Sequence, residues 1–482
     1  MTETPLRKSL AWRSGFGFLL QVVLRLRGLL IIPVLTRALP LSELGVISLG
    51  NALTSGLAPL LVLGLHNGLS LRVVHLQGEE VRPAMLSVLS FAAAFSITMT
   101  ALILWAVSTG VFGVGLSPLL PVLFPLGLFT IGTALREVAM VLPQVRQQLR
   151  FIAGISLFMD FGGVIMALLL VLSGFGAYGV FMGVGCLSLL GVMLAASYSL
   201  ESAEGRWAWN EAFLKASLHT ALPAVPLAFG LWTLQFSDYF FVSYHRSVAD
   251  LAVYGLSYSL ASPTLMVIAA INLTYLPTCV EILRQGRDSF ARFMDKSSTL
   301  FAVFGIATIA FTTSAGPALA TLIGGAPYVE SGRLLPIIVA SYVLFSLSQL
   351  QQFVPGAMIQ DMQALARAYL WSAVVNFVLN YFLVPRFGMW GAAWSTLASY
   401  ALAFVLLSRS VRSLLPEMAW TERAVALLGL AAVSIGCALL TRSLAGGLWS
   451  ALAIGGGCVL VTVSLAFALG LLSRSDLARL RG

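Results

Sequence analysis

The chain of 482 residues is 59% hydrophobic and only 10% charged, whereas an ordinary soluble domain is about a quarter charged. This composition excludes a water-soluble protein, because a domain of this size could not remove so much apolar surface from water. The net charge of +9 does not indicate nucleic-acid binding, since Lys and Arg lie mostly between hydrophobic runs and no basic stripe is interleaved with aromatic residues.

The hydrophobic runs are long and lack the alternation typical of barrel strands, so we predict membrane-spanning helices of about twenty residues each. Gly, Pro and charged residues separate the runs. The sequence therefore predicts an all-α polytopic membrane protein with about fourteen transmembrane helices. In chain order, the expected spans are residues 11–38, 45–70, 84–109, 118–142, 151–173, 176–198, 216–243, 249–278, 298–323, 333–355, 367–385, 389–408, 423–441 and 449–472.

Lys and Arg are distributed unevenly over the connecting loops. With a cytoplasmic N-terminus, the outer loops receive only Arg37, Arg246, Arg333, Arg386 and Arg442, and the inner loops receive most of the others. This asymmetry is typical of the positive-inside rule, so we expect both termini in the cytoplasm.

The four cysteines, Cys186, Cys279, Cys437 and Cys458, are scattered singly along apolar stretches. They show no metal-type spacing, so we expect neither a metal site nor a cofactor.

The sequence contains a weak two-fold repeat. SELGVISLGNAL, from Ser42, resembles ADLAVYGLSYSL, from Ala249, and GFGAYGVFMG, from Gly174, resembles RFGMWGAAWS, from Arg386. The two offsets are nearly equal, and an even number of helices per block would insert both blocks in the same orientation. We therefore predict two pseudo-symmetric six-helix lobes, residues 1–215 and 216–412, related as a parallel repeat. Residues 413–482 would add two C-terminal helices and a short cytoplasmic tail.

Ionisable residues at membrane depth are the best indicators of function, because each costs several kcal/mol unless it faces a polar cavity or a partner (about 2.5–3.5 for Arg or Asp). Arg25 and Arg27 in the first span point roughly 200° apart. Arg25 shares a polar stripe with Gln21, so we expect Arg25 to face a cavity and bind a substrate phosphate. The alternative is an ion pair between Arg25 and an aspartate. Arg27 is a further candidate for substrate binding, although we expect it to pair with a neighbouring helix or to reach the membrane surface.

Two aspartates lie at membrane depth, Asp160 in the fifth span and Asp238 in the seventh. Asp238 follows Gln235 by three residues, so these two share a helix face. A carboxylate in a low-dielectric site could carry a proton in each transport cycle, which makes both aspartates candidates for ion coupling. A static ion pair is the competing interpretation for each.

Uncharged polar stripes and interfacial charges give further candidates. Asn376 and Asn380 lie one turn apart in the eleventh span and suit sugar hydroxyls, although such residues also hold helices together. Arg72 and Arg136 lie near the cytoplasmic ends of their spans. They are candidates for a gate or a lipid-headgroup contact, with ordinary interfacial charge as the alternative.

Four stretches resemble the polysaccharide transporters, the bacterial lipid-linked oligosaccharide flippases of the multidrug/oligosaccharidyl-lipid/polysaccharide (MOP) exporter superfamily. Each motif is loose, but their order and spacing over nearly the whole chain are specific. The stretches are RLRGLLIIPVLTRALPLSELGVISL, SDYFFVSYHRSVADLAVYGLSYSLA, RLLPIIVASYVLFSLSQLQQF and NFVLNYFLVPRFGMWGAAWSTLASY.

The resemblance implies a two-lobed, MATE-like helical bundle in the bacterial inner membrane. It implies alternating-access transfer of an undecaprenyl-diphosphate-linked oligosaccharide from the cytoplasmic to the periplasmic leaflet, alongside other polysaccharide assembly proteins. A peptidoglycan lipid-precursor flippase and a drug/cation antiporter are the alternatives within the superfamily. A membrane-embedded glycan polymerase is less favoured, because the outer loops are short and there is no catalytic acid/base cluster, so we do not expect an enzyme.

Overall fold

A computed structural model describes residue 28 and residues 31–111, 114–358, 363–416, 418 and 420–472, without the side chains of 267–274, 276–277, 356–357 and 420–422. The described residues are helices joined by short turns, and they contain no strand. The predicted all-α fold is thus confirmed. Helices are favoured in lipid because each one satisfies its backbone hydrogen bonds internally. The chain divides into two compact units, Met1–Ala252 and Val253–Gly482.

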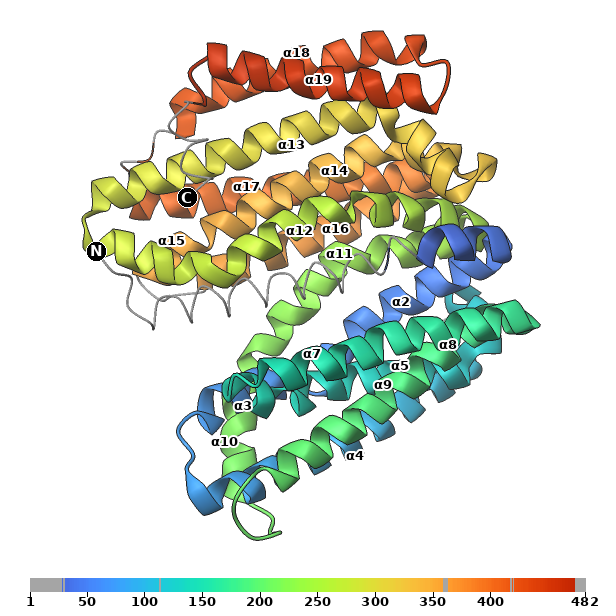
Figure 1. Cartoon of the computed structure of the whole chain (residues 1–482), viewed down its shortest axis with the longest axis vertical. Coiled ribbons are helices and arrows are strands. Elements are labelled where there is room, and N and C mark those ends of the chain that lie inside the picture. Colours follow the sequence, from blue (N-terminus) through green and yellow to red (C-terminus); the bar gives the residue numbers. More distant parts are fainter. Residues whose placement is uncertain are drawn as a thin grey trace. The chain divides into compact units, whose positions relative to one another are not determined.

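The first unit contains ten α-helices after a helical segment at residues 31–38. They are α2 (Leu41–Leu61), α3 (Leu65–Val73), α4 (Val81–Ser108), α5 (Leu123–Ala139), α6 (Val141–Val145), α7 (Leu149–Leu157), α8 (Gly163–Leu170), α9 (Gly176–Glu201), α10 (Glu211–Ala221) and α11 (Val225–His245). Helices α2, α4 and α9 pack around α5 and against one another, and α8 packs on α9 (Figure 1). Short 3-10 or π turns interrupt several spans, at Val114–Val122, Phe158–Gly162, Val171–Phe175 and Leu222–Ala224.

Helix α12 (Val248–Arg284) begins in the first unit and continues into the second. The second unit then contains α13 (Arg287–Gly324), α14 (Val329–Gln351), α15 (Phe353–Met358), α16 (Gln363–Phe387), α17 (Met389–Leu414), α18 (Trp420–Thr441) and α19 (Leu448–Ala468). Helix α14 packs between α13 and α17, and α18 and α19 both pack on α13 (Figure 1).

Eleven helical stretches of the described residues are long and apolar enough to cross a membrane. One of them, Leu149–Glu201, has 53 residues and would measure about 80 Å as a single helix, far more than a bilayer. It reverses at Gly174 and Gly176, where φ is 89° and 54°, and α8 then packs back against α9. The stretch therefore holds two spans. The first expected span lies mostly outside the described residues, so the total of fourteen stays a prediction.

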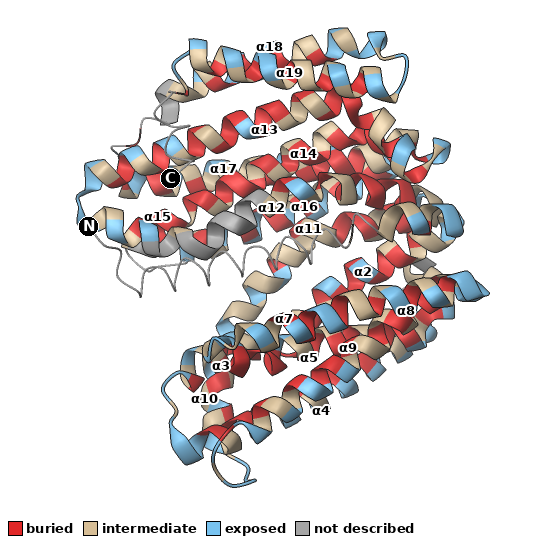
Figure 2. Cartoon of the chain, viewed as in Figure 1, coloured by how far each residue is buried: buried red, intermediate tan, exposed pale blue. Residues whose placement is uncertain are grey.

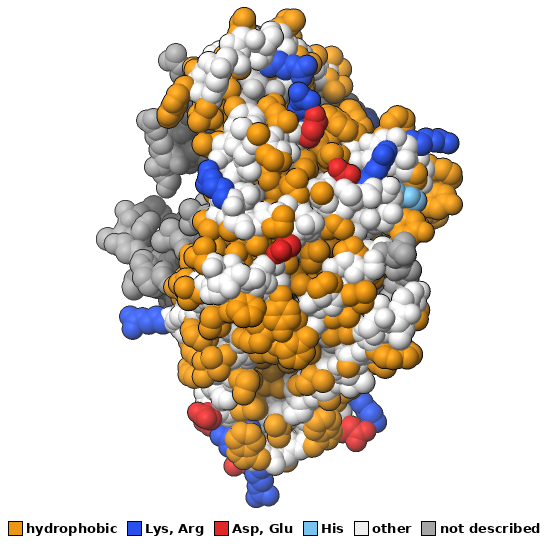
Figure 3. Space-filling view, turned by 90° about the vertical axis from the view of Figure 1, so that its right-hand side faces the viewer, with side chains coloured by type: hydrophobic (Ala, Val, Ile, Leu, Met, Phe, Trp, Pro, Cys, Tyr) orange, Lys and Arg blue, Asp and Glu red, His pale blue; other side chains and the backbone are white. Residues whose placement is uncertain are grey.

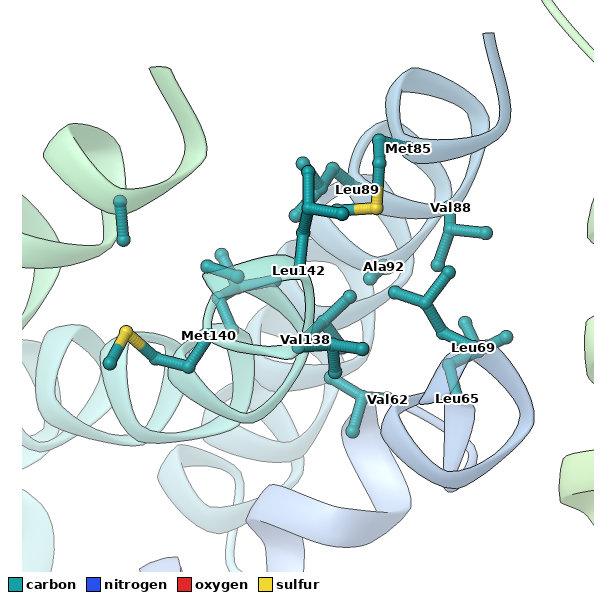
Figure 4. Close-up of a cluster of buried hydrophobic side chains, with 14 of the residues drawn as sticks. Val62, Leu65, Leu69, Met85, Val88, Leu89, Ala92, Val138, Met140 and Leu142 are labelled. Atoms are coloured by element: carbon teal, nitrogen blue, oxygen red, sulfur yellow. The ribbon is translucent and has the colours of Figure 1, made fainter. Parts of the chain in front are cut away.

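Each unit is packed around buried aliphatic side chains (Figure 2). A cluster of buried side chains in the first unit joins α2–α3, α4 and α5–α6, and it includes Leu65, Leu69, Met85, Val88 and Val138 (Figure 4). Outward-facing positions are also apolar, as in Ile97, Leu102 and Trp105 of α4. This arrangement is expected where the solvent is lipid. A view of one face shows few and separated charged side chains among hydrophobic ones (Figure 3).

The two motifs of the sequence repeat lie at helix starts and have the same local geometry in both units. Gly176 (φ 54°, ψ −141°) precedes the first turn of α9, and Gly388 (φ 59°, ψ −135°) precedes that of α17. Only glycine adopts these angles at little cost. The repeat is therefore visible in the backbone at these hairpins, while the division into lobes at residues 215 and 412 stays a prediction.

The helices of the seventh expected span, α10 and α11, lie within the first unit. They run antiparallel to α2 and α3, and glycines permit the close approach. A Cβ added at Gly56 would overlap the Trp232 indole, and one added at Gly68 would overlap the Ser217 carbonyl. The Trp232 indole also donates to the Ala52 carbonyl over 2.9 Å.

Candidate functional site

The first unit contains a bidentate ion pair between two residues that the sequence suggested for different roles. Arg136 lies in the last turn of α5, and Asp160 lies in the π turn Phe158–Gly162. The guanidinium nitrogens Nη1 and Nη2 donate to the two Asp160 carboxylate oxygens over 3.1 and 2.8 Å. The Asp160 side chain is 12% exposed and that of Arg136 is 27% exposed. Such fork-to-fork pairs are among the strongest hydrogen-bonded contacts.

The surrounding helices hold this pair in place. Both α5 and the π turn pack on α9, where a Cβ at Gly132 would collide with Ser188 and one at Gly191 would collide with Met159. The π turn widens the helix by one residue and turns Asp160 toward α5, and such bulges occur often at functional sites. Asp160 lies eleven residues from the start of α7, about 17 Å along the helix, so it is well within the apolar spanning stretch and not at its start. Among the described residues, the Asp160 carboxylate thus has an ion-pair partner, Arg136.

Asp238 is also buried, at 1% exposure, in the C-terminal half of α11. Its Oδ1 accepts a hydrogen bond from the Tyr239 backbone N–H over 3.0 Å. Gln235, one turn earlier, is half-buried. A buried carboxylate at this depth fits the expected ion-coupling role, which stays a prediction.

Arg72 joins α3 to α10. Its Nε and Nη2 both donate to the Thr220 hydroxyl, over 3.1 and 3.0 Å. Helix α3 follows a break at Leu63 and Gly64, both with positive φ (49° and 65°), which redirects the chain after α2. Arg72 is half-buried, and its expected gate or headgroup role stays a prediction.

The second unit also contains buried uncharged polar groups. Asn376 and Asn380 of α16 are fully buried, and Asn380 Nδ2 donates to Asn376 Oδ1 over 3.0 Å. The opposite face of α16 exposes Trp371, Phe377 and Tyr381. The helix is therefore apolar outside and polar inside, which is the pattern of a membrane helix that turns its polar groups toward protein.

Tyrosine and hydroxyl side chains continue this buried polar region, and sequence reasoning missed them. Tyr258 of α12 lies 3.1 Å, hydroxyl to hydroxyl, from Tyr254 and donates to Thr396 of α17 over 3.4 Å. Its ring also meets the edge of Tyr342 in α14. Tyr258 lies in one repeated motif and Thr396 lies directly after another, so the sequence repeat could have pointed to both residues.

The first unit uses the equivalent motifs differently. Glu43, in the first turn of α2, accepts a hydrogen bond from the Ala177 backbone N–H at the start of α9 over 2.7 Å. The two motifs of the first repeat therefore meet in space, and the carboxylate neutralises a helix N-terminus. Its repeat counterpart Asp250 has no side-chain partner among the described residues.

The remaining expected site residues lie outside the described residues, namely Arg25, Gln21 and Arg27. Among the described residues there is no group of three or more His, Cys, Asp and Glu side chains that could hold a metal ion. The four cysteines are free.

The sequence model of the polysaccharide biosynthesis protein family matches residues 34–333. No curated protein matches the chain. Among solved structures, an inward closed conformation of the lipid II flippase MurJ has a TM-score of 0.75 at 13% identity, over 94% of this chain and 98% of that chain. MATE in complex with MaD3S has a TM-score of 0.55 at 12% identity, over 86% and 96%. An outward-facing multidrug resistance MATE family transporter of the MOP superfamily has a TM-score of 0.52 at 14% identity, over 87% and 95%.

These similarities show that the chain has the fold of the lipid II flippase MurJ and of MATE transporters. The family match covers more than half of the chain, so the protein belongs to the polysaccharide biosynthesis protein family. The predicted family resemblance and the MATE-like helical fold are confirmed.

Proposed function

We propose that the protein is a flippase that moves an undecaprenyl-diphosphate-linked oligosaccharide from the cytoplasmic to the periplasmic leaflet of the bacterial inner membrane. The observation that carries this proposal is the family match, which concerns polysaccharide biosynthesis and spans residues 34–333. The likeness to a lipid II flippase supports a lipid-linked glycan as the substrate class. Two separately compact units are what alternating access requires.

Within this function, Arg25 and Gln21 would bind the diphosphate, with Arg27 beside them. A guanidinium stays charged at every relevant pH and matches phosphate oxygens. Asn376 and Asn380 would contact the sugars. Asp238 would carry the coupling ion, and Asp160 could do so only if the pair with Arg136 opens during the cycle.

A peptidoglycan lipid-precursor flippase is the second candidate function. The TM-score of 0.75 with the lipid II flippase favours it over a drug antiporter, because the MATE structures superpose less well. Rescue of cells depleted of their own lipid II flippase would support this second function.

Deletion of the gene tests the main proposal. We expect a lipid-linked repeat unit to accumulate on the cytoplasmic side and surface polysaccharide to be lost. The Arg25→Ala variant should fail to restore export at normal expression, while Arg25→Lys should restore part of it. Unchanged surface polysaccharide in the deletion strain would overturn the proposal.

A further inference from the structure

Helix α2 presents three different faces within the first unit. Gly50 and Thr54 face α9 and α5, where the Thr54 hydroxyl lies 2.9 Å from that of Thr130. Ala52 and Gly56 face Trp232 of α11. The third face carries polar side chains at steps of three and four residues, and it is exposed or half-exposed. These residues are Ser48, Asn51 and Ser55.

The third face lies near the middle of the membrane. Asn51 is the eleventh of the 21 residues of α2, about 15 Å from either end of the helix. At that depth an exposed side chain meets lipid, water or substrate. An unpaired amide in hydrocarbon is costly, so this face is not built for lipid. By contrast, the exposed face of α4 carries Ile97, Leu102 and Trp105, which suit lipid well.

Asn51 is available for a ligand. The Ser55 hydroxyl donates to the Asn51 backbone carbonyl over 2.8 Å, which satisfies Ser55 locally. The Asn51 carboxamide itself has no hydrogen-bond partner within the described part of the chain. The same holds for the carboxamide of Gln235 in α11.

Helix geometry places Asn51 and Gln235 on the same side of the contact between α2 and α11. The two helices are antiparallel and meet at Ala52 and Trp232, so Asn51 and Gln235 are at similar depth. Viewed along each helix, Asn51 lies about 100° from Ala52, and Gln235 lies about 60° from Trp232 toward the same side. Phe229, which is exposed, lies on the opposite flank of α11. One flank of this helix pair thus carries two carboxamides, and the opposite flank carries an exposed aromatic ring.

We propose that Asn51 and Gln235, with Ser55 beside them, bind sugar hydroxyl groups of the transported glycan at mid-membrane depth. A carboxamide offers a donor and an acceptor together, which matches the neighbouring hydroxyls of a pyranose ring. The pair is uncharged, so it suits the sugars and not the diphosphate. This inference rests on the proposed function and assigns residues to the glycan part of that substrate.

The test is photo-cross-linking in cells that make their native polysaccharide. The residue p-benzoylphenylalanine replaces Asn51 in one variant and Thr98, on the exposed face of α4, in the matched control. We expect glycan-bearing polyprenyl diphosphate, identified by mass spectrometry, on position 51 only, and phospholipid on position 98. In parallel, Asn51→Ala should lower export about tenfold at normal expression, as expected for a lost substrate hydrogen bond, and Thr98→Ala should not.

A phospholipid adduct or no adduct at position 51, with the deletion strain still accumulating lipid-linked glycan, would overturn the inference and leave the proposed function standing. A deletion strain without such accumulation would instead refute the proposed function itself. Unreduced export by Asn51→Ala would also overturn the assignment of Asn51.

Discussion

The two units contain buried polar contacts of different charge. In the first unit, Arg136 and Asp160 form a charged, bidentate pair. In the second unit, Asn376, Asn380, Tyr258 and Thr396 form uncharged contacts. Breaking a charged pair is costly, because the removal of one partner leaves the other charge buried without a counter-charge. Breaking a neutral contact loses only a hydrogen bond.

Breaking the ion pair should have the largest effect. Asp160→Asn leaves the Arg136 guanidinium without its counter-charge, and we expect a loss of roughly 3–5 kcal/mol in the free energy of unfolding. Thermal unfolding of the purified protein in detergent measures this loss. The double variant Arg136→Met with Asp160→Leu should recover most of the stability. If Asp160→Asn were as stable as the wild type, the ion pair would not contribute to the free energy of unfolding.

The glycine contact of α2 with α11 should rank second. Gly56→Ala adds a Cβ that overlaps Trp232, and we expect a loss of about 1–3 kcal/mol from overpacking. The matched control is Gly436→Ala in α18, where a Cβ meets nothing within 4 Å. That control should gain stability, because alanine is the better helix former. Equal unfolding temperatures for the two variants would contradict the close packing of these helices.

The neutral contact of the second unit should matter less. Asn380→Ala removes the hydrogen bond to Asn376 Oδ1 and should cost about 1 kcal/mol. A comparison of its unfolding temperature with that of Asp160→Asn in the same detergent shows which of the two contacts contributes more to stability. If Asn380→Ala cost as much as Asp160→Asn, the contrast between charged and neutral interiors would fail.

The repeated acids provide the smallest and most direct comparison. Glu43→Ala removes the acceptor at the start of α9 and should cost about 0.3–1 kcal/mol. Asp250→Ala, at the equivalent place in the repeat, should change stability less. A denaturant titration of both variants, with wild type alongside, resolves such differences. An effect of Asp250→Ala as large as that of Glu43→Ala would show that both repeats use the same cap.

The sequence predicted the parts of this protein that depend on neighbouring residues. A hydrophobic run near bilayer length forms a helix in lipid because every backbone hydrogen bond is made within the run. The repeated Phe-Gly motif also predicted where two helices begin, α9 at Gly176 and α17 just after Gly388. Glycine is suited to the positive φ at both places. The sequence pattern did not predict the irregular places in the helices, such as the break between α2 and α3 and the π turn at Asp160.

Partner choice was decided by the tertiary structure alone. Asp160 was a sound candidate for a buried charge, yet its partner Arg136 lies 24 residues away on another helix. Asn51 lies in the middle of an apolar span, and its exposure depends on which face of α2 meets α5, α9 and α11. The physical reason is that helix formation is local in sequence, whereas rotation and packing of one helix against the next are set by distant side chains.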